Sequence, residues 1–200
     1  MCKINFKKTL PYIGSILFMI ILSYIYFSPD ILEGKVLFQG DTQQGIAIGQ
    51  EGKAFRKATG ETTRWTNSLF SGMPNFQISP SYANNYWMGQ IGRIYHLGLQ
   101  SPASLVFIMM LGFFILLSAM KIRWYLALVG AIAYAFSSYF FIIIGAGHIW
   151  KFITLAYIPP TIAGIILAYR GKYIGGAALI GFFGMMQITS NHIQMSYYFM

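Results

Sequence analysis

Five long apolar stretches, separated by polar segments, dominate the hydrophobic pattern of the chain. They cover approximately residues 10–27, 103–120, 125–144, 152–169 and 173–190. None of the five contains an Asp, Glu, Lys or Arg residue. About 20 consecutive apolar residues in a helix cross the hydrocarbon core of a bilayer. The pattern therefore predicts an all-α polytopic membrane protein, with five transmembrane helices that belong to one transmembrane domain over residues 1–200.

The composition agrees with a chain that is surrounded mainly by membrane lipids. Apolar residues make up 56% of the sequence and charged residues only 10%, whereas soluble domains contain about 25% charged residues. The formal net charge is +9, but the basic residues lie between the apolar stretches rather than on a separate soluble fold. This distribution favours anionic lipid headgroups or phosphate-bearing substrates as partners, and it argues against nucleic acid.

The basic residues of the short segments predict a cytoplasmic N-terminus. In that orientation the inner segments contain Lys3, Lys7, Lys8, Lys121, Arg123, Arg170 and Lys172. The outer segment 145–151 contains Lys151 as its one basic residue, which fits the excess of positive charge on the inside. The first stretch ends with Tyr24, Tyr26 and Phe27, where a signal peptide carries small residues. We therefore expect an uncleaved anchor, with a cleaved signal peptide as the alternative.

Residues 28–102 are too polar to cross a membrane and form a predicted large extracytoplasmic loop. All five acidic residues of the chain lie in it, namely Asp30, Glu33, Asp41, Glu51 and Glu61. We expect a helix over residues 41–57 that stops near Gly60, because Asp41 can cap its first turn and Gln44 can complete a capping box. Capping is one interpretation of Asp41, and catalysis or metal binding is the alternative.

A second outer helix is predicted over residues 84–99. Its apolar side chains recur at helical spacing, at Trp87, Ile91, Ile94 and Tyr95. Arg93 and His96 fall on the opposite face and are expected to face water or a cleft. A helix with one apolar and one polar face of this kind is typical of the membrane interface.

The polar side chains suited to chemistry gather at the predicted outer ends of the helices. They are His148 and Lys151 after the third stretch, and Asn191, His192 and Gln194 after the fifth. This combination of imidazole, ammonium and amide groups favours a site for phosphate or sugar hydroxyls, with a structural role at the helix ends as the alternative. In the loop, Arg64 is a further candidate for phosphate and Trp65 for stacking on a sugar ring, with packing as the alternative. The two histidines lack the short spacing of common zinc sites.

Four sequence features together resemble the YfhO family of bacterial membrane proteins. They are Gly40-Asp41, the segment Trp65-Thr66-Asn67-Ser68-Leu69-Phe70-Ser71-Gly72-Met73-Pro74, the turn Gly147-His148, and Asn191-His192-x-Gln194-x-x-Tyr197-Tyr198. The resemblance covers nearly the whole chain and is greatest for the long members of the family. The chain also ends at Met200 without a polar tail. We therefore expect it to be the N-terminal part of a longer protein.

The YfhO family is similar to the GT-C class of membrane glycosyltransferases, so the resemblance implies a GT-C-like fold. Such enzymes transfer a sugar from a polyprenyl-phosphate donor at the outer face of the cytoplasmic membrane, here to an envelope glycan or lipid. Their acidic residue lies in the first large outer loop, which implies that Asp41 is catalytic. It would act as a general base, or hold a divalent cation such as Mg²⁺ or Mn²⁺ against the donor phosphate.

Two other classes of function remain as alternatives. A transporter or flippase for a lipid-linked substrate often carries ionisable side chains inside its membrane spans, and the five stretches contain no Asp, Glu, Lys or Arg. A non-catalytic membrane protein that assists envelope assembly needs no catalytic carboxylate. The polar groups at the outer helix ends favour the enzyme over both.

Overall fold

The structure is a computed structural model that describes residues 6–75 and 85–200, and it is mostly helical. Its helices are α1 (Phe6–Tyr26), α2 (Ser28–Leu32), α3 (Gly40–Ile48), α4 (Gln50–Thr59), α5 (Asn85–Tyr95), α6 (Ala103–Ala119), α7 (Trp124–Ala135), α8 (Ser138–Ala146), α9 (Ile149–Tyr169), α10 (Tyr173–Thr189) and α11 (Ile193–Phe199). Two short strands, β1 (Trp65–Thr66) and β2 (Met73–Pro74), pair antiparallel, with Trp65 opposite Pro74.

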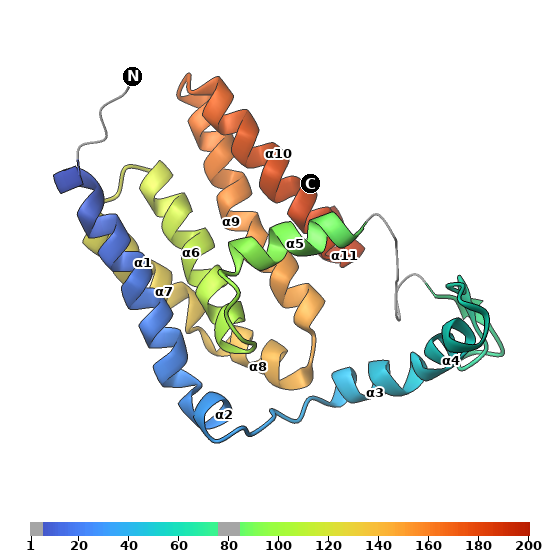
Figure 1. Cartoon of the computed structure of the whole chain (residues 1–200). Helices are drawn as coiled ribbons and strands as arrows, with labels where there is room; N and C mark the ends of the chain where they lie inside the picture. The colour runs from blue at the N-terminus through green and yellow to red at the C-terminus, as the bar shows by residue number, and fades with distance from the viewer. Residues whose placement is uncertain (1–5, 76–84) are drawn as a thin grey trace.

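The helices α1, α6, α7, α8, α9 and α10 form a bundle in which successive apolar stretches run in opposite directions (Figure 1). The C-terminal ends of α1, α8 and α10 point to the same end of the bundle as the N-terminal ends of α6 and α9. Large buried side chains between them include Phe107, Ile108 and Phe152. At the opposite end, the guanidinium of Arg170 donates a hydrogen bond to the carbonyl of Ala119. Helix ends that the sequence assigns to one side therefore lie together.

Several of these helices are suited to crossing a membrane. In the described part of the chain, α9 and residues Thr9–Tyr26 of α1 are long and apolar enough to do so. The helices α7 and α8 meet the same criterion together, as a pair bent by 46°. The helices α6 and α10 are equally apolar but have 17 residues each. The structure thus supports an all-α membrane protein, while five separate crossings stay a prediction.

The sequence predicts one helix over residues 125–144, but the structure has two helices there, α7 and α8. Helix α7 ends at Ala135 and α8 begins at Ser138, because Ser137 between them adopts an extended conformation with φ −65° and ψ 142°. Adjacent serines favour such a break, since their hydroxyls compete for backbone hydrogen bonds. The break redirects α8 toward the N-terminal end of α9, where the candidate site lies.

Helices α6 and α9 come closest where Gly112 faces the carbonyl of Ala156. A Cβ atom on Gly112 would lie 2.5 Å from the Ala156 oxygen and 3.1 Å from Cδ of Pro160. Pro160 has no N–H to donate to that carbonyl one turn earlier. The absence of a side chain at Gly112 therefore lets the two backbones meet, as small residues do between membrane helices.

Helices α9 and α10 form a second close crossing. A Cβ atom on Gly176 would lie 2.7 Å from the carbonyl oxygen of Gly164. The sequence also suggests close approach at Gly175, Gly181 and Gly184, but a Cβ atom at these three positions would meet nothing within 4 Å. The crossing thus depends on one glycine from each helix.

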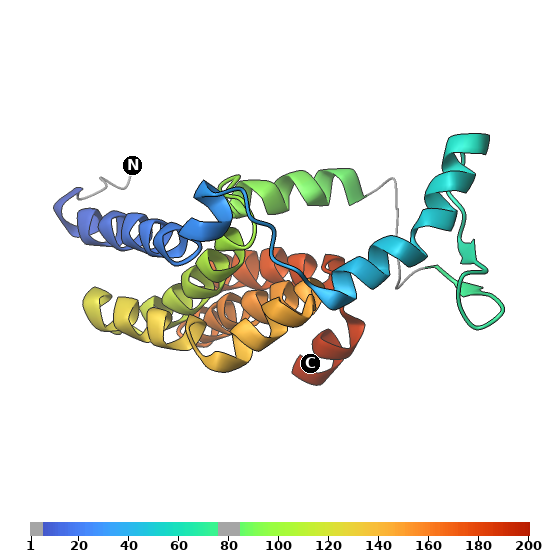
Figure 2. The ribbon, with the colours of Figure 1, turned by 90° about the horizontal axis from the view of Figure 1, so that it is seen from below.

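The first outer helix of the sequence prediction is split in two. Helix α3 ends before Gly49 and α4 begins directly after it. The predicted stop is confirmed at Gly60, which adopts the left-handed conformation with φ +78°. Neither helix contains a buried residue, and α4 projects away from the bundle (Figure 2). The start of α3 therefore contacts the bundle, through the hydrogen bond from Gln39 to Ile144, while α4 points away from it.

The second outer helix, α5, lies across α9 and α10. Ile91 and Tyr95 pack against a cluster around Tyr157 in the bundle, but Trp87 and Ile94 are 70% and 74% exposed on the protein surface. Nε2 of His96, a residue expected to face water or a cleft, lies 3.2 Å from the hydroxyl of Tyr157. Of the two expected surroundings, water or a cleft, His96 has the cleft, since it lines a cavity together with Arg93 and Tyr157. Burial lowers the pKa of His96.

Candidate functional site

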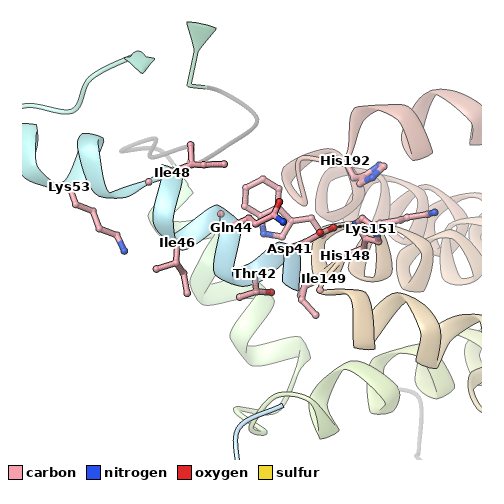
Figure 3. A pocket seen from close by; sticks show the side chains of 14 residues that line it. Asp41, Thr42, Gln44, Ile46, Ile48, Lys53, His148, Ile149, Lys151 and His192 are labelled. Carbon is pink, nitrogen blue, oxygen red and sulfur yellow. Dashed lines mark ion pairs between the residues drawn. The ribbon is translucent and has the colours of Figure 1, made fainter. Parts of the chain in front are cut away.

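A cavity of about 710 Å³ opens where the start of α3 meets the bundle. Its walls come from three segments that are far apart in the sequence: residues 41–53, residues 147–151 and His192. Figure 3 shows Asp41, His148, Lys151 and His192 gathered toward the bundle, with Lys53 at the other end of the cavity. Four of the predicted site residues therefore share one cavity.

The central contact of the cavity joins the carboxylate of Asp41 to the imidazole of His148, and it is an ion pair when the imidazole is protonated. Oδ2 of the carboxylate lies 3.1 Å from Nδ1 of the imidazole, and both side chains are about half exposed, at 49% and 51%. The pair joins the first turn of α3 to the residue that precedes α9. Solvent and a ligand can therefore reach both groups.

The predicted capping role of Asp41 was wrong. Gln39 occupies the N-cap position, and no side chain caps α3. The Gln39 side chain instead donates a 2.6 Å hydrogen bond from Nε2 to the carbonyl of Ile144, and its Oε1 accepts one from Thr42. This residue ties the start of α3 to the end of α8, which leaves the Asp41 carboxylate available to His148.

A glycine allows α3 to come this close. Gly147 has φ +94°, a left-handed conformation that suits glycine. A Cβ atom there would lie 2.9 Å from Oγ1 of Thr42 and 3.2 Å from Cβ of Gln39. The turn Gly147-His148 therefore serves two purposes, since it admits α3 and places His148 beside Asp41.

His192 and Lys151 are the other two predicted site residues in the cavity, beside Asp41 and His148. Nδ1 of His192 accepts a hydrogen bond from the backbone N–H of Met195, at 3.3 Å, and so caps α11. Burial is the main cause that lowers the pKa of His192. A backbone hydrogen bond raises this pKa by less, and the nearby Lys151 lowers it further. The ammonium of Lys151 also lies 5.5 Å from the ring centre of Tyr139. The site thus contains a neutral imidazole near neutral pH beside a lysine.

The other predicted site residues do not line this cavity. Arg64 and Trp65 belong to the hairpin around β1, where the indole Nε1 of Trp65 donates to Asn67 at 3.2 Å. A Cβ atom on Gly72 would lie 2.7 Å from the same Nε1, so the indole packs on the hairpin itself. Asn191 adopts φ +62° next to His192, and Gln194 is exposed and donates to the hydroxyl of Tyr198. Sugar stacking by Trp65 stays a prediction.

Glu51 was missed by the sequence reasoning, although it organises the hairpin. Its carboxylate accepts hydrogen bonds from the hydroxyls of Thr66 and Ser68, from the backbone N–H groups of Asn67 and Ser68, and from the side-chain amide of Asn67. These bonds, led by that of Thr66, lower the pKa of Glu51 to about 2. The sequence does show an acidic residue on a predicted helix that precedes a Thr-Asn-Ser segment. The contact between Glu51 and that segment becomes apparent only in the folded structure.

The Glu51 contacts predict a specific effect on the hairpin. Its pKa falls from 4.5 to about 2 on folding, so its stabilising effect is complete above pH 4.5 and is lost as the pH falls through about 2. Glu51→Gln removes the carboxylate that accepts from the backbone N–H groups of Asn67 and Ser68. These amides should therefore exchange with solvent faster at every pH. Hydrogen exchange at these amides measures this, with Glu61→Gln as a control on an exposed acid. Equal protection in wild type and Glu51→Gln at pH 6 would contradict the assignment.

A second, smaller cavity of about 310 Å³ lies between α5, α9 and α10. Its polar residues are Arg93, His96, Tyr157, Thr189 and Ser190, and its apolar walls include Met186. The sequence predicts that Arg93 and His96 face water or a cleft, but it does not identify Tyr157 as a partner, because Tyr157 is 61 residues away from His96.

Neither a protein-family model, nor a curated protein, nor a solved structure matches this chain. The arrangement of side chains is therefore the main evidence on what the site can do.

Proposed function

We propose that the chain is part of a membrane glycosyltransferase of the GT-C type, related to the YfhO family. It transfers a sugar from a polyprenyl-phosphate donor to an envelope glycan or lipid at the outer face of the bacterial cytoplasmic membrane. The observation that carries this proposal is the Asp41–His148 pair in a cavity that also contains Lys151 and His192. The N-terminus is cytoplasmic and the five apolar stretches cross the membrane, so this cavity faces outward.

The dimensions and charges of the cavity support such a substrate. Its volume of about 710 Å³ lies within the range of about 300–1,000 Å³ that is typical of small-molecule sites. A lipid phosphate leaves with negative charge, which needs cations or hydrogen-bond donors nearby. Lys151 supplies a cation and His192 an imidazole at one end of the cavity. A carboxylate and an imidazole in contact supply the means to remove a proton from an acceptor hydroxyl.

The described residues do not fit a resident metal ion. Within residues 6–75 and 85–200, no three His, Cys, Asp or Glu side chains gather closely enough to hold one. The Asp41 carboxylate is already paired with His148. The proposed reaction therefore assigns no step to Mg²⁺ or Mn²⁺, and it relies on the side chains of the cavity.

One assay separates this function from its alternatives. Membranes that contain the full-length protein are supplied with a polyprenyl-phosphate donor that carries a radiolabelled sugar, and with envelope glycan and lipid acceptors. We expect label to become covalently attached to the acceptor and polyprenyl phosphate to be released, in amounts that depend on the protein. Movement of intact labelled donor across the membrane would indicate a flippase instead. The absence of both, with protein at normal level, would indicate an assembly factor.

A further inference from the structure

We propose that His148 and His192 are held as opposite tautomers, so that His148 is the proton acceptor of the cavity and His192 a hydrogen-bond donor. Asp41 then acts through His148 as a positioning residue. This inference rests on the proposed sugar transfer for its chemistry, but the assignment of the tautomers rests on contacts within the chain.

The tautomer of His148 follows from its partner. The Asp41 carboxylate can only accept hydrogen bonds, and it lies 3.1 Å from Nδ1. Nδ1 of His148 must therefore carry the proton, and in the neutral ring Nε2 then has a free lone pair. Because His148 lines the cavity, it offers a basic nitrogen to a ligand there. The same carboxylate stabilises the imidazolium that forms when Nε2 takes a proton.

The tautomer of His192 follows from the opposite kind of partner. The backbone N–H of Met195 can only donate, and it is shared between the carbonyl of His192 at 3.1 Å and Nδ1 of the same residue at 3.3 Å. Nδ1 must therefore be bare, and Nε2 carries the proton of the neutral ring. Burial lowers the pKa of His192, and the positive charge of Lys151 lowers it further, which keeps this ring neutral near pH 7. His192 therefore offers a donor where His148 offers an acceptor.

These assignments divide the reaction between the two rings. The acceptor hydroxyl gives its proton to Nε2 of His148 while its oxygen bonds to the anomeric carbon of the sugar. The bond from that carbon to the phosphate oxygen breaks, and its electron pair stays on the phosphate. Nε2–H of His192 and the ammonium of Lys151 stabilise this oxygen. The proton on His148 then passes to the phosphate or to water, which restores the starting state.

Nuclear magnetic resonance of the full-length protein, labelled with ¹⁵N-histidine in lipid nanodiscs, tests the tautomers without any substrate. The ¹⁵N shifts and the couplings to ring carbons distinguish a protonated from a bare nitrogen, and His148→Gln and His192→Gln assign the signals. We expect His148 to be protonated at Nδ1 only and His192 at Nε2 only at pH 7.5. Asp41→Ala should shift His148 toward the Nε2–H form without affecting His192, while Glu61→Gln should change neither ring.

The outcomes separate this inference from the proposed function. Protonation of His148 at Nε2 in the wild type would overturn the assignment of roles, whatever the activity. His148→Gln should also lower sugar transfer by about 10²–10⁴-fold, the usual contribution of a proton-transfer group. Wild-type transfer in His148→Gln would remove His148 as the acceptor and leave the proposed function standing. Correct tautomers in a protein that transfers no sugar would overturn the function alone.

Discussion

Asp41→Asn is expected to lower sugar transfer by about 10²–10⁴-fold, with protein level and folding unchanged. The amide keeps the size of the carboxylate, and its oxygen can still accept the proton on Nδ1 of His148. It lacks the negative charge that stabilises the imidazolium, and rotation of the amide would present an N–H that favours the wrong tautomer. Both effects act in the transfer step rather than in folding.

The folding cost of this substitution is small by comparison. Asp41 lies in the first turn of α3, where a negative charge stabilises the helix by about 0.3–1 kcal/mol. Transfer of labelled sugar in membranes, normalised to protein level, measures the effect. Glu61→Gln is the matched control, because Glu61 is an exposed acid in the same outer loop. Wild-type transfer by Asp41→Asn would exclude Asp41 from the mechanism and remove the main support for a glycosyltransferase.

Gly112→Ala is expected to destabilise the bundle by about 1–3 kcal/mol, the usual cost of overpacking a core. The new Cβ atom would lie 2.5 Å from the backbone oxygen of Ala156, and 3.1 Å from Pro160. Neither obstacle is the end of a flexible side chain, so α6 and α9 must separate. Thermal unfolding of the purified protein in detergent, followed by loss of the monodisperse species, measures the change.

Gly181→Ala provides the control for this prediction. A Cβ atom at Gly181 meets nothing within 4 Å, and Ala is a better helix former than Gly by about 1 kcal/mol. The same substitution should therefore be neutral or stabilising on α10. An unfolding temperature of Gly112→Ala at or above that of the wild type would show that α6 and α9 do not meet at this glycine.

The helices of the bundle could be predicted from the sequence because membrane crossing places a simple requirement on length and polarity. The helices α6 and α10 begin at Ala103 and Tyr173, close to the approximate starts that the sequence predicts. The break at Ser137 was not predicted, because two serines in an apolar stretch are also compatible with a continuous helix. The contact of His96 with Tyr157 could not be predicted either, because Tyr157 comes from another helix.

For the candidate site too, the sequence predicts which polar residues take part but not how they contact one another. Asp41, His148, Lys151 and His192 were singled out as polar groups at helix ends, and they line one cavity. The contact of Asp41 with His148 could not be predicted, because it depends on Gln39 binding the end of α8. The role of Glu51 depends likewise on a hairpin that forms 15 to 17 residues later in the chain. Local patterns identify helices and polar ends, whereas pairings between distant segments require the fold.

The spacing between Gln39 and Asp41 limits where relatives of this protein can gain or lose residues. Residues 34–39 contain no helix or strand, so insertions before Gln39 can lengthen the connection from α2 without moving α3. One residue inserted between Gln39 and Asp41 would turn the carboxylate by about 100° around the axis of α3. Relatives that keep this site are therefore expected to vary freely in length up to Gln39, and to preserve a fixed interval from the glutamine to the aspartate.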